Sequence, residues 1–453
     1  MAETPAPRPR LPTARGELLL KQLQQLEESQ WWPAEQLLEY QLNQMQLLFQ
    51  HAWHTSPFYR ERLTVAGYMT DLTLDWTMWR RLSLLTRREI QHAGDTLHSS
   101  KVPARFGCIT TVQTSGTTGE PVTVRRTEID QLLWEALTLR DHVWHQRDFS
   151  GRLAVIRESI DPGLGAPPDG AIINNWGTPV CEVAVTGAAG VLKSSDIETQ
   201  ARWLIRFNPD YLLTYPTILK ALAEYFAATS ERLPNLRGVR TLGETVAPDL
   251  RESCRQVWGV PLHDMYSCTE LGYLALQCPQ NDGHYHVMAE SVLVEILDEK
   301  GGSCAPGEIG RMVATSLHNF ATPLIRYELG DYVEAGPPCR CGRGLPTITS
   351  IPGRTRNLLI LPTGQRRWAN VSFDRYPEIM MVRQHQLVQH TPQDIEARLV
   401  VDVPLTASQE TLLREIILEE LGYPFRLSLT YFKDEIPRGP GGKFEKFVSH
   451  IAA

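Results

Sequence analysis

The sequence has no long apolar run, few cysteines and no excess of positive charge. No apolar run approaches the roughly 18 residues that a membrane-spanning helix needs, so we expect no membrane partner. The 8 cysteines are scattered through 453 residues, too sparsely for a disulfide scaffold, which favours a reducing, cytoplasmic location. The 45 basic and 52 acidic residues give a net charge of -7, which argues against a broad nucleic-acid-binding surface.

The amino-terminal residues and three arginine pairs are interpreted as exposed chain. Residues 1–15 combine prolines with arginines and lack the apolar core of a signal peptide, so they are predicted to form a disordered lead-in. The pairs Arg80-Arg81, Arg87-Arg88 and Arg125-Arg126 are predicted to be solvated helix or loop surface. No internal repeat and no long low-complexity segment is present.

Hydrophobic periodicity predicts an α/β body. Apolar residues at three- and four-residue spacing predict an amphipathic helix over residues 33–54, ending near Ser56-Pro57. From Gly151 onward, helical stretches over residues 197–207 and 218–228 alternate with short β-rich runs. These runs are residues 153–156, 211–215, 239–242, 293–297 and 312–314. Such alternation predicts a substantial, partly parallel sheet that binds ligands where its strands end.

A domain boundary is predicted at Ile351-Pro352-Gly353-Arg354, which divides the chain into residues 16–352 and 353–453. The second segment has strand-like runs over residues 358–361, 397–401 and 427–432, an α+β pattern. A helix precedes the last strand. We expect Ser408 to cap it and Gly422 to end it.

A run of hydroxyl side chains and glycines, Thr114-Ser115-Gly116-Thr117-Thr118-Gly119-Glu120-Pro121, indicates an anion-binding loop, which we expect at the end of a strand of the predicted sheet. Glycine lets backbone N–H groups converge on one point, and the hydroxyls add further donors to phosphate oxygens. It is not a Walker loop, because Glu120 and Pro121 stand where that motif has Lys and Ser or Thr. The alternative is a flexible surface loop rich in turn-forming residues.

Four separated segments together resemble the adenylate-forming ligases. Besides the loop, they are Tyr266-Ser267-Cys268-Thr269-Glu270, Ile325-Arg326-Tyr327-Glu328-Leu329-Gly330-Asp331, and Gly441-Gly442-Lys443. Further motifs narrow the resemblance to the phenylacetate-coenzyme A ligase branch: Ser56-Pro57-Phe58-Tyr59-Arg60, Leu84-Leu85-Thr86, Pro323-Leu324-Ile325-Arg326-Tyr327, and Cys339-Arg340-Cys341-Gly342-Arg343. The likeness implies a large α/β adenylation domain with mixed sheets and a small, mobile carboxy-terminal α+β domain.

The resemblance also implies roles for individual residues. Thr114, Ser115, Gly116, Thr117, Thr118 and Gly119 would hold the pyrophosphate part of ATP, with Thr269 beside the phosphate. Glu270 would hold Mg²⁺, for which a hard oxygen ligand is suited. Tyr266, Gly243 and Glu244 would lie near the adenine, Asp331 on the ribose hydroxyls and Arg354 on the nucleotide.

Lys443 is the residue expected to place a positive charge between the substrate carboxylate and the α-phosphate. Such a lysine acts by stabilising the transition state electrostatically rather than by donating a proton. Lys446 is the nearby alternative. Three departures from the family pattern put the acyl acceptor in doubt: Glu120, Arg356, and the segment Thr363-Gly364-Gln365-Arg366-Arg367. Within that segment, Arg366-Arg367 is either a coenzyme A phosphate contact or a solvated hairpin.

Cys278, His286, Cys339 and Cys341 form a second constellation. Three thiolates and one imidazole are the donors of a closed tetrahedral Zn²⁺ site, which is structural because no position is left for water. His284 could replace His286, but the family resemblance favours His286. The alternative is a set of reduced, buried cysteines.

The sequence therefore predicts an ATP-dependent, AMP-forming ligase that activates a small aromatic carboxylic acid and passes it to coenzyme A. Trp176 and Tyr215 are candidate walls of the acid pocket, or else core residues. An amine or a carrier-protein thiol could replace coenzyme A as acceptor, and a non-catalytic protein that keeps the fold is a further alternative. A homodimer is possible.

Overall fold

The computed structural model describes residues 12–69, 73–114, 121–158, 163–247, 249–369, 371, 373, 376–379, 381–438 and 444–451. The chain divides into two compact units. The first comprises Met1–Leu329 and Val333–Ile351, and the second Gly330–Tyr332 and Pro352–Ala453. None of the helices in the described ranges combines the length and apolar character needed to cross a bilayer.

The first unit begins with a helix that corrects the predicted lead-in. Helix α1 (Ala14–Ser29) starts directly after Thr13, whose hydroxyl accepts a hydrogen bond from the Gly16 amide at 3.0 Å. Ala14 and Arg15 are therefore helical, because a capping residue precedes them. Residues 1–11 lie outside the described residues. Helix α2 (Ala34–Thr55) matches the predicted amphipathic helix, and Ser56 caps the next helix, α3 (Pro57–Val65).

The remaining elements of the first unit alternate as expected. Its further helices are α4 (Trp76–Arg81), α5 (Arg87–Ala93), α6 (Glu128–Trp144), α7 (Thr178–Cys181), α8 (Ile197–Phe207), α9 (Pro216–Ala228) and α10 (Leu250–Trp258). Its strands, the last two of which run on into the second unit, are β1 (Ile109–Gln113), β2 (Thr123–Thr127), β3 (Leu153–Ile156), β4 (Ala171–Ile173), β5 (Ala189–Leu192), β6 (Tyr211–Thr214), β7 (Gly238–Leu242), β8 (Leu262–Cys268), β9 (Gly272–Cys278), β10 (Asn281–Val287), β11 (Val292–Leu297), β12 (Ile309–Ser316), β13 (Tyr327–Ala335) and β14 (Thr347–Arg354).

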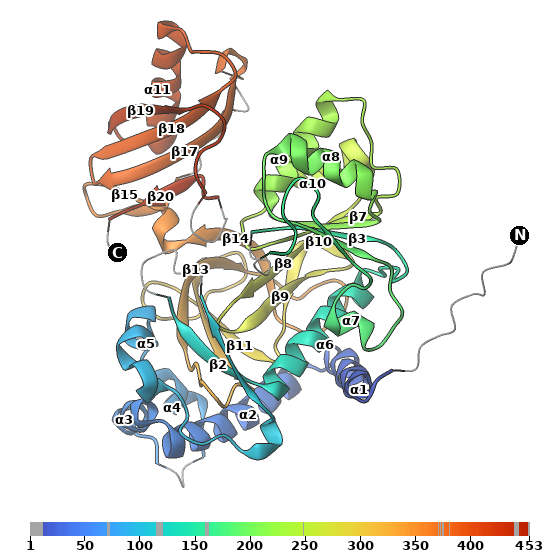
Figure 1. Ribbon diagram of the computed structural model, residues 1–453. Coiled ribbons are helices and arrows are strands. Elements are labelled where there is room, and N and C mark those ends of the chain that lie inside the picture. Colours follow the sequence, from blue (N-terminus) through green and yellow to red (C-terminus); the bar gives the residue numbers. More distant parts are fainter. Residues whose placement is uncertain are drawn as a thin grey trace, which may run out of the picture. The chain divides into compact units, whose positions relative to one another are not determined.

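A large mixed sheet organises this unit (Figure 1). Among the described residues it has 12 strands, in the order β11-β12-β13-β14-β10-β9-β8-β7-β6-β3-β5-β4. Strands β5, β3, β6, β7 and β8 are parallel, and β9 turns back antiparallel to β8. The mixed α/β fold class predicted from the sequence is confirmed.

The side chains of each parallel strand point alternately to the two faces of the sheet, and helices or other elements cover both faces. On β3, Ala154 and Ile156 pack with residues of α8, α9 and α10, whereas Leu153 belongs to the cluster that includes α6. Such two-sided burial explains why these strands read as short continuous apolar runs in the sequence.

The sequence led us to expect the hydroxyl-rich loop at the end of a strand of the parallel sheet. The two strands that flank the loop are not part of that sheet. The loop joins β1 to β2, which form a separate two-stranded antiparallel sheet in the described residues. Four of the five residues of β1 are exposed, so the apolar residues of this strand do not mark it as part of a buried sheet. Residues 115–120 of the loop lie outside the described residues.

The described residues of the second unit form a four-stranded sheet, a two-stranded sheet and one long helix. Its elements are β15 (Leu358–Ile360), β16 (Arg366–Trp368), β17 (Val382–Thr391), β18 (Asp394–Val401), α11 (Ala407–Leu421), β19 (Arg426–Phe432) and β20 (Phe447–Ser449), with sheet order β19-β18-β17-β20. Leu413, Ile416 and Ile417 of α11 are buried in one cluster with residues of β17 and β18.

The predicted cap of α11 is wrong by two residues. Thr406, not Ser408, caps the helix, and it forms a reciprocal capping box with Gln409. Both positions carry a hydroxyl, but only Thr406 has a glutamine three residues later, which is the pattern of a capping box. Gly422 ends the helix in the left-handed conformation, with φ of 52°.

Candidate functional site

Glu270, the predicted magnesium ligand, lies in the turn between β8 and β9 and is only 9% exposed. Its Oε1 atom accepts hydrogen bonds from Arg87 Nη1 at 3.2 Å and from the Tyr327 hydroxyl at 3.4 Å. Burial raises the pKa of Tyr327 far above its usual value, and the charge of Glu270 raises the pKa further. The hydroxyl of Tyr327 therefore stays protonated and can donate a hydrogen bond.

Arg87 joins this carboxylate to Thr114, the first residue of the hydroxyl-rich loop. Its Nη2 atom donates to Thr114 Oγ1 at 2.9 Å, while Nη1 bonds Glu270. Arg87 is the first residue of α5, whose amino terminus is fixed by the capping box of Thr86 and Glu89. The guanidinium group therefore reaches both segments from a rigid base.

Thr114 closes the base of the loop. Its amide donates to the Val122 carbonyl at 3.0 Å, and its hydroxyl accepts from the Val122 amide at 2.9 Å. The two ends of the loop are thus held together. The other predicted loop residues, Ser115, Gly116, Thr117, Thr118 and Gly119, lie outside the described residues, as does Glu120.

Two sequence motifs of the first unit pair through their backbones beside this cluster. The Leu85 amide donates to the Arg326 carbonyl at 2.7 Å, and the Glu328 amide donates to the Leu85 carbonyl at 2.9 Å. The Leu84-Leu85-Thr86 motif thereby brings Arg87 to Tyr327. Arg326 itself forms a two-pronged ion pair with Glu295, at 2.9 and 3.1 Å, which is a structural role.

Arg126 corrects the prediction that the arginine pairs are solvated. It is 8% exposed, and its Nη2 atom donates to the backbone carbonyl of Thr269. The pattern of β2 explains the error, because successive residues of a strand point to opposite faces. Arg125 points outward and pairs with Asp95, while Arg126 points inward and supports the turn that carries Thr269 and Glu270.

The predicted adenine contacts lie in, or directly after, two neighbouring parallel strands. Gly243 follows β7 with φ of 76°, a conformation that favours glycine, and Tyr266 is a buried residue of β8. The Glu244 carboxylate accepts from the Thr217 amide at 3.0 Å and from its hydroxyl at 2.8 Å. Since Thr217 is in the first turn of α9, this carboxylate stabilises the helix terminus.

In the second unit, Asp331 and Arg354 form an ion pair, with Arg354 Nε 3.0 Å from the carboxylate. Arg356, which departs from the family pattern, binds Glu445 through both Nε and Nη2, and so fixes the chain two residues after Lys443. Arg367 donates to the Glu420 carbonyl at 3.1 Å, which favours the hairpin interpretation for this residue. Lys443 lies outside the described residues.

The four predicted metal ligands come together in the first unit. The donor atoms of Cys278, His286, Cys339 and Cys341 lie within 4.8 Å of one another. The Sγ atoms of Cys278 and Cys339 are 3.7 Å apart, and Cys341 Sγ is 3.2 Å from His286 Nε2. A Zn–S bond of about 2.3 Å places two thiolates of a tetrahedral site about 3.8 Å apart, so the donor set fits zinc. His284 is not a member of this group of described residues.

The surroundings of the group keep His286 in the neutral form that a metal ligand requires. Burial lowers the pKa of His286 to about 4, so the imidazole is neutral and offers a lone pair. Burial raises the pKa of Cys278 to about 12, so this thiol needs a nearby cation to become a thiolate ligand.

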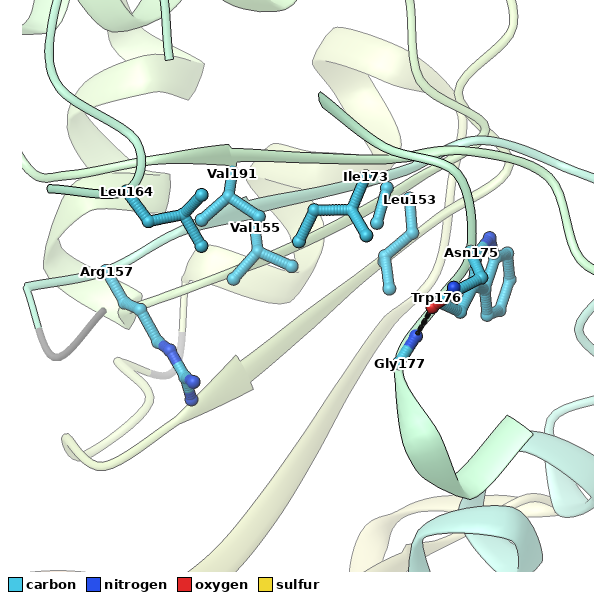
Figure 2. A pocket seen from close by; sticks show the side chains of 10 residues that line it. Leu153, Val155, Arg157, Leu164, Ile173, Asn175, Trp176, Gly177 and Val191 are labelled. Atoms are coloured by element: carbon cyan, nitrogen blue, oxygen red, sulfur yellow. Dashed lines mark hydrogen bonds between the residues drawn. The ribbon is translucent and has the colours of Figure 1, made fainter. Parts of the chain in front are cut away.

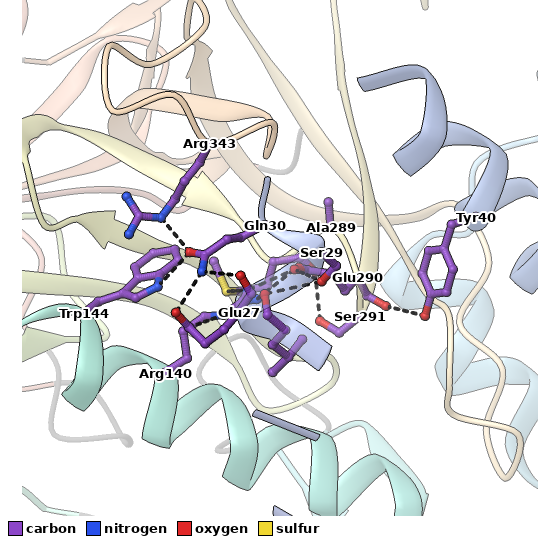
Figure 3. A network of polar contacts seen from close by, with 12 residues as sticks. Glu27, Ser29, Gln30, Tyr40, Arg140, Trp144, Ala289, Glu290, Ser291 and Arg343 are labelled. Carbon is purple, nitrogen blue, oxygen red and sulfur yellow. Dashed lines mark hydrogen bonds and ion pairs between the residues drawn. The ribbon is translucent and has the colours of Figure 1, made fainter. Parts of the chain in front are cut away.

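The segment that carries two of the cysteines is tied to the first helix (Figure 3). Arg343 Nε donates to Gln30 Oε1 at 2.7 Å, and Trp144 Nε1 donates to the same oxygen at 3.1 Å. Deeper in the same network, Arg140 pairs with Glu290 at 2.8 Å. The segment that follows Cys341 is therefore tied, through Arg343, to the end of α1 and to α6.

A family model described as "AMP-binding enzyme" matches residues 72–321. The chain belongs to the AMP-binding enzyme family. Its sequence is 25% identical to a phenylacetate-coenzyme A ligase of Pseudomonas putida over 341 residues, 72% of each chain. It is 26% identical to the corresponding protein of Thermus thermophilus over 356 residues, 73% of each chain. The predicted resemblance to this branch of the adenylate-forming ligases is confirmed.

A solved structure supports the fold. A 2-hydroxyisobutyryl-CoA ligase in a postadenylation state aligns with a TM-score of 0.69 and 17% identity, covering 92% of this chain and 90% of that one. Arg87, Arg126 and Tyr327 contact the predicted site residues, although sequence reasoning did not select these three. Two of these residues lie beside or within motifs that the sequence analysis had singled out. Arg87 follows Leu84-Leu85-Thr86, and Tyr327 ends Pro323-Leu324-Ile325-Arg326-Tyr327. These two motifs were the signal that could have identified the residues.

Proposed function

We propose that this protein is an ATP-dependent, AMP-forming ligase that activates a small aromatic carboxylic acid and transfers the acyl group to coenzyme A. The observation that carries the proposal is the cluster of Thr114, Arg87 and Glu270 within the region that matches the family. The names of the curated relatives, at 22 to 26% identity, support the aromatic acid and the coenzyme A acceptor. The cytoplasmic location and the homodimer stay predictions.

In this mechanism, positive charge must offset the repulsion between a carboxylate and a triphosphate. Glu270 would hold Mg²⁺, which supplies much of that charge and neutralises the departing pyrophosphate. Arg87, which already lies between Thr114 and Glu270, would bind the same pyrophosphate. The first unit would bind ATP and the acid, and the second would supply Lys443 together with Asp331 and Arg354.

The test is pyrophosphate release measured across aryl, arylacetic and short fatty acids, with and without coenzyme A. We expect release with arylacetic or aryl acids and a thioester product when coenzyme A is present. AMP without a thioester, but with an amide when an amine is added, would move the assignment to an amide synthetase. No acid-dependent pyrophosphate release with any acid would overturn the proposal.

Replacing Arg87 by alanine is expected to raise the KM for ATP about 10- to 100-fold, because a charge-assisted hydrogen bond contributes about 1.5–3 kcal/mol. Arg88→Ala is the matched control, since Arg88 is exposed on the same helix. Initial-rate kinetics with varied ATP would measure both. Equal KM values for Arg87→Ala and the wild type would show that Arg87 is structural only.

We also propose that Cys278, His286, Cys339 and Cys341 hold one structural zinc ion. Metal analysis of protein purified without chelator is expected to find about one zinc per chain. Cys339→Ser should lose the metal, whereas Cys304→Ser, at a partly buried cysteine outside the group, should keep it. Wild-type protein without bound zinc would contradict this assignment and leave a set of reduced cysteines.

A further inference from the structure

A small cavity opens on the face of the parallel sheet opposite α8 and α9 (Figure 2). Its volume is about 210 Å³. Alternate residues of two parallel strands, Leu153 and Val155 of β3 and Ala189 and Val191 of β5, form its floor, and Ile173 of β4 adds to it. The long dimension of the cavity is therefore lined by aliphatic side chains.

The two ends of this cavity are polar. Arg157 lies at one end of the row of aliphatic side chains, and Asn175, Trp176 and Gly177 lie at the other (Figure 2). Trp176, a pocket wall considered from the sequence, lines the cavity. Tyr215 is not among its lining residues, because it is buried in the cluster on the α8 and α9 side of the sheet.

Arg157 is a cation without a protein anion in the described part of the chain. Its Nε atom is buried and has no hydrogen-bond partner there, and no ion pair forms with its guanidinium group among those residues. The side chain as a whole is only partly buried, but a bound anion would pair with its guanidinium group beside the aliphatic side chains and compensate the buried Nε donor.

Arg157 also lies at the sheet edge where a carboxylate has to be activated. It directly follows β3, which runs parallel to β6 and, through it, to β7. The carboxyl end of β7 carries Gly243 and Glu244, the predicted adenine contacts. In sheets of this kind, ligands bind outside the carboxyl ends of the strands, so Arg157 faces the same edge as the nucleotide residues.

Asn175 defines the opposite end of the cavity. Its Oδ1 atom accepts from the Gly177 amide at 2.8 Å, which fixes the orientation of the amide group. No hydrogen bond of its Nδ2 group occurs within the described residues, so this donor is available to a ligand. The group it would meet is a hydrogen-bond acceptor.

We propose that this cavity binds the acid substrate, with the carboxylate on Arg157, the apolar body along β3 and β5, and an acceptor group at Asn175. The inference rests on the proposed function and specifies its substrate class: a single-ring acid with a polar substituent opposite the carboxylate. Size supports one ring, because a cavity of about 150 Å³ accommodates benzene and this one is somewhat larger.

The test measures the binding of defined acids by calorimetry without ATP. The probes are 4-hydroxyphenylacetate, phenylacetate and 2-naphthylacetate. Wild-type protein is expected to bind the first two and to bind the naphthyl acid at least about tenfold more weakly. Arg157→Gln should weaken both single-ring acids about 10- to 100-fold, and Arg157→Lys should recover part of that loss.

Asn175→Ala should weaken 4-hydroxyphenylacetate about 3- to 10-fold and leave phenylacetate unchanged. Arg202→Gln is the charge-matched control, since Arg202 is exposed on α8 and pairs only with Glu198 in the described residues. It should bind both acids as the wild type does. ATP binding and thermal melting of each variant establish that it is folded.

Three results would overturn the inference: no binding of either single-ring acid to wild-type protein, unchanged binding in folded Arg157→Gln, or equal losses for both acids in Asn175→Ala. Its failure is distinguishable from failure of the proposed function. If acid-dependent pyrophosphate release occurs and Arg157→Gln retains it with an unchanged KM for the acid, the enzyme assignment stands and the acid binds elsewhere.

Discussion

Replacing Lys443 by alanine is expected to lower acid-dependent pyrophosphate exchange at least about 10²- to 10³-fold, while ATP binding survives. This is the size of the loss when one preorganised charge or donor is removed from a transition state. The lysine would act where the carboxylate meets the α-phosphate, so its contribution is made in the transition state rather than in the ATP complex. Exchange kinetics and equilibrium ATP binding, measured on the same variant, separate the two effects.

Residues on either side of residues 439–443 are anchored in the second unit. Ile436 and Phe444 are buried in one cluster with Val400, and Glu445 is bound by Arg356. These contacts hold the chain next to Lys443 without using its side chain. An alanine at this position should therefore leave the fold of the unit intact.

Lys446→Ala is the matched control, because Lys446 is the competing lysine and lies three residues away. Its backbone carbonyl accepts from the Leu387 amide at 2.8 Å, a bond that survives loss of the side chain. We expect this variant to keep most of its exchange activity. Normal exchange in Lys443→Ala together with a large loss in Lys446→Ala would transfer the role to Lys446.

Replacing Asp141 by asparagine is expected to destabilise the first unit by about 3–5 kcal/mol, the cost of leaving a buried ion network without one partner. Asp141 is 1% exposed and bonds Arg147 Nη1 at 2.7 Å, while Arg240 also pairs with it. Burial alone would raise the pKa of this carboxyl, but Arg147 and Arg240 hold the pKa far below its usual value. The asparagine would leave both buried guanidinium groups without a negative charge.

The effect has a defined pH dependence. Because the folded pKa of Asp141 is lowered, its stabilisation is present above the unfolded pKa of about 3.9 and is lost as the pH falls below that value. The free energies of unfolding of wild type and Asp141→Asn should therefore differ most near pH 7 and still differ, by a smaller amount, at pH 3, because the folded carboxyl stays ionised well below the unfolded pKa. Urea unfolding at both pH values measures this.

Asp148→Asn serves as the control for the same chemical change on the surface. Asp148 is about half exposed and pairs with Arg237, which is exposed as well. Surface ion pairs contribute little, so this variant should unfold nearly as the wild type does. Equal stability of Asp141→Asn and wild type at pH 7 would show that the buried network tolerates the loss of its carboxylate.

Local sequence patterns predicted the elements whose conformation depends on near neighbours. The run over residues 153–156 is a strand with those bounds, and the helix over residues 197–207 is present as predicted. The four metal-ligand candidates are also brought together, because their donor types and the family spacing were informative. The cap of α11 was misplaced, since Ser408 and Thr406 differ only in which residue stands three positions later.

The site was harder to predict because its contacts join distant parts of the chain. Arg87 and Glu270 are 183 residues apart in the sequence, and the motif that precedes Arg87 does not show that this residue, rather than the exposed Arg88, reaches Glu270. The antiparallel pairing of β1 with β2 likewise removed the loop from the parallel sheet to which the alternating pattern had assigned it.

The sequence by itself determined the family, the α/β class and the chemical types available for binding ATP, since these depend on motifs and on local periodicity. Only the tertiary structure decided that Arg126 and Asp141 are buried, that Arg87 bridges Thr114 and Glu270, and that Arg157 lines one end of an apolar cavity. The reason is physical: strand and helix periods fix which way a side chain points, but strand order and packing determine what it meets.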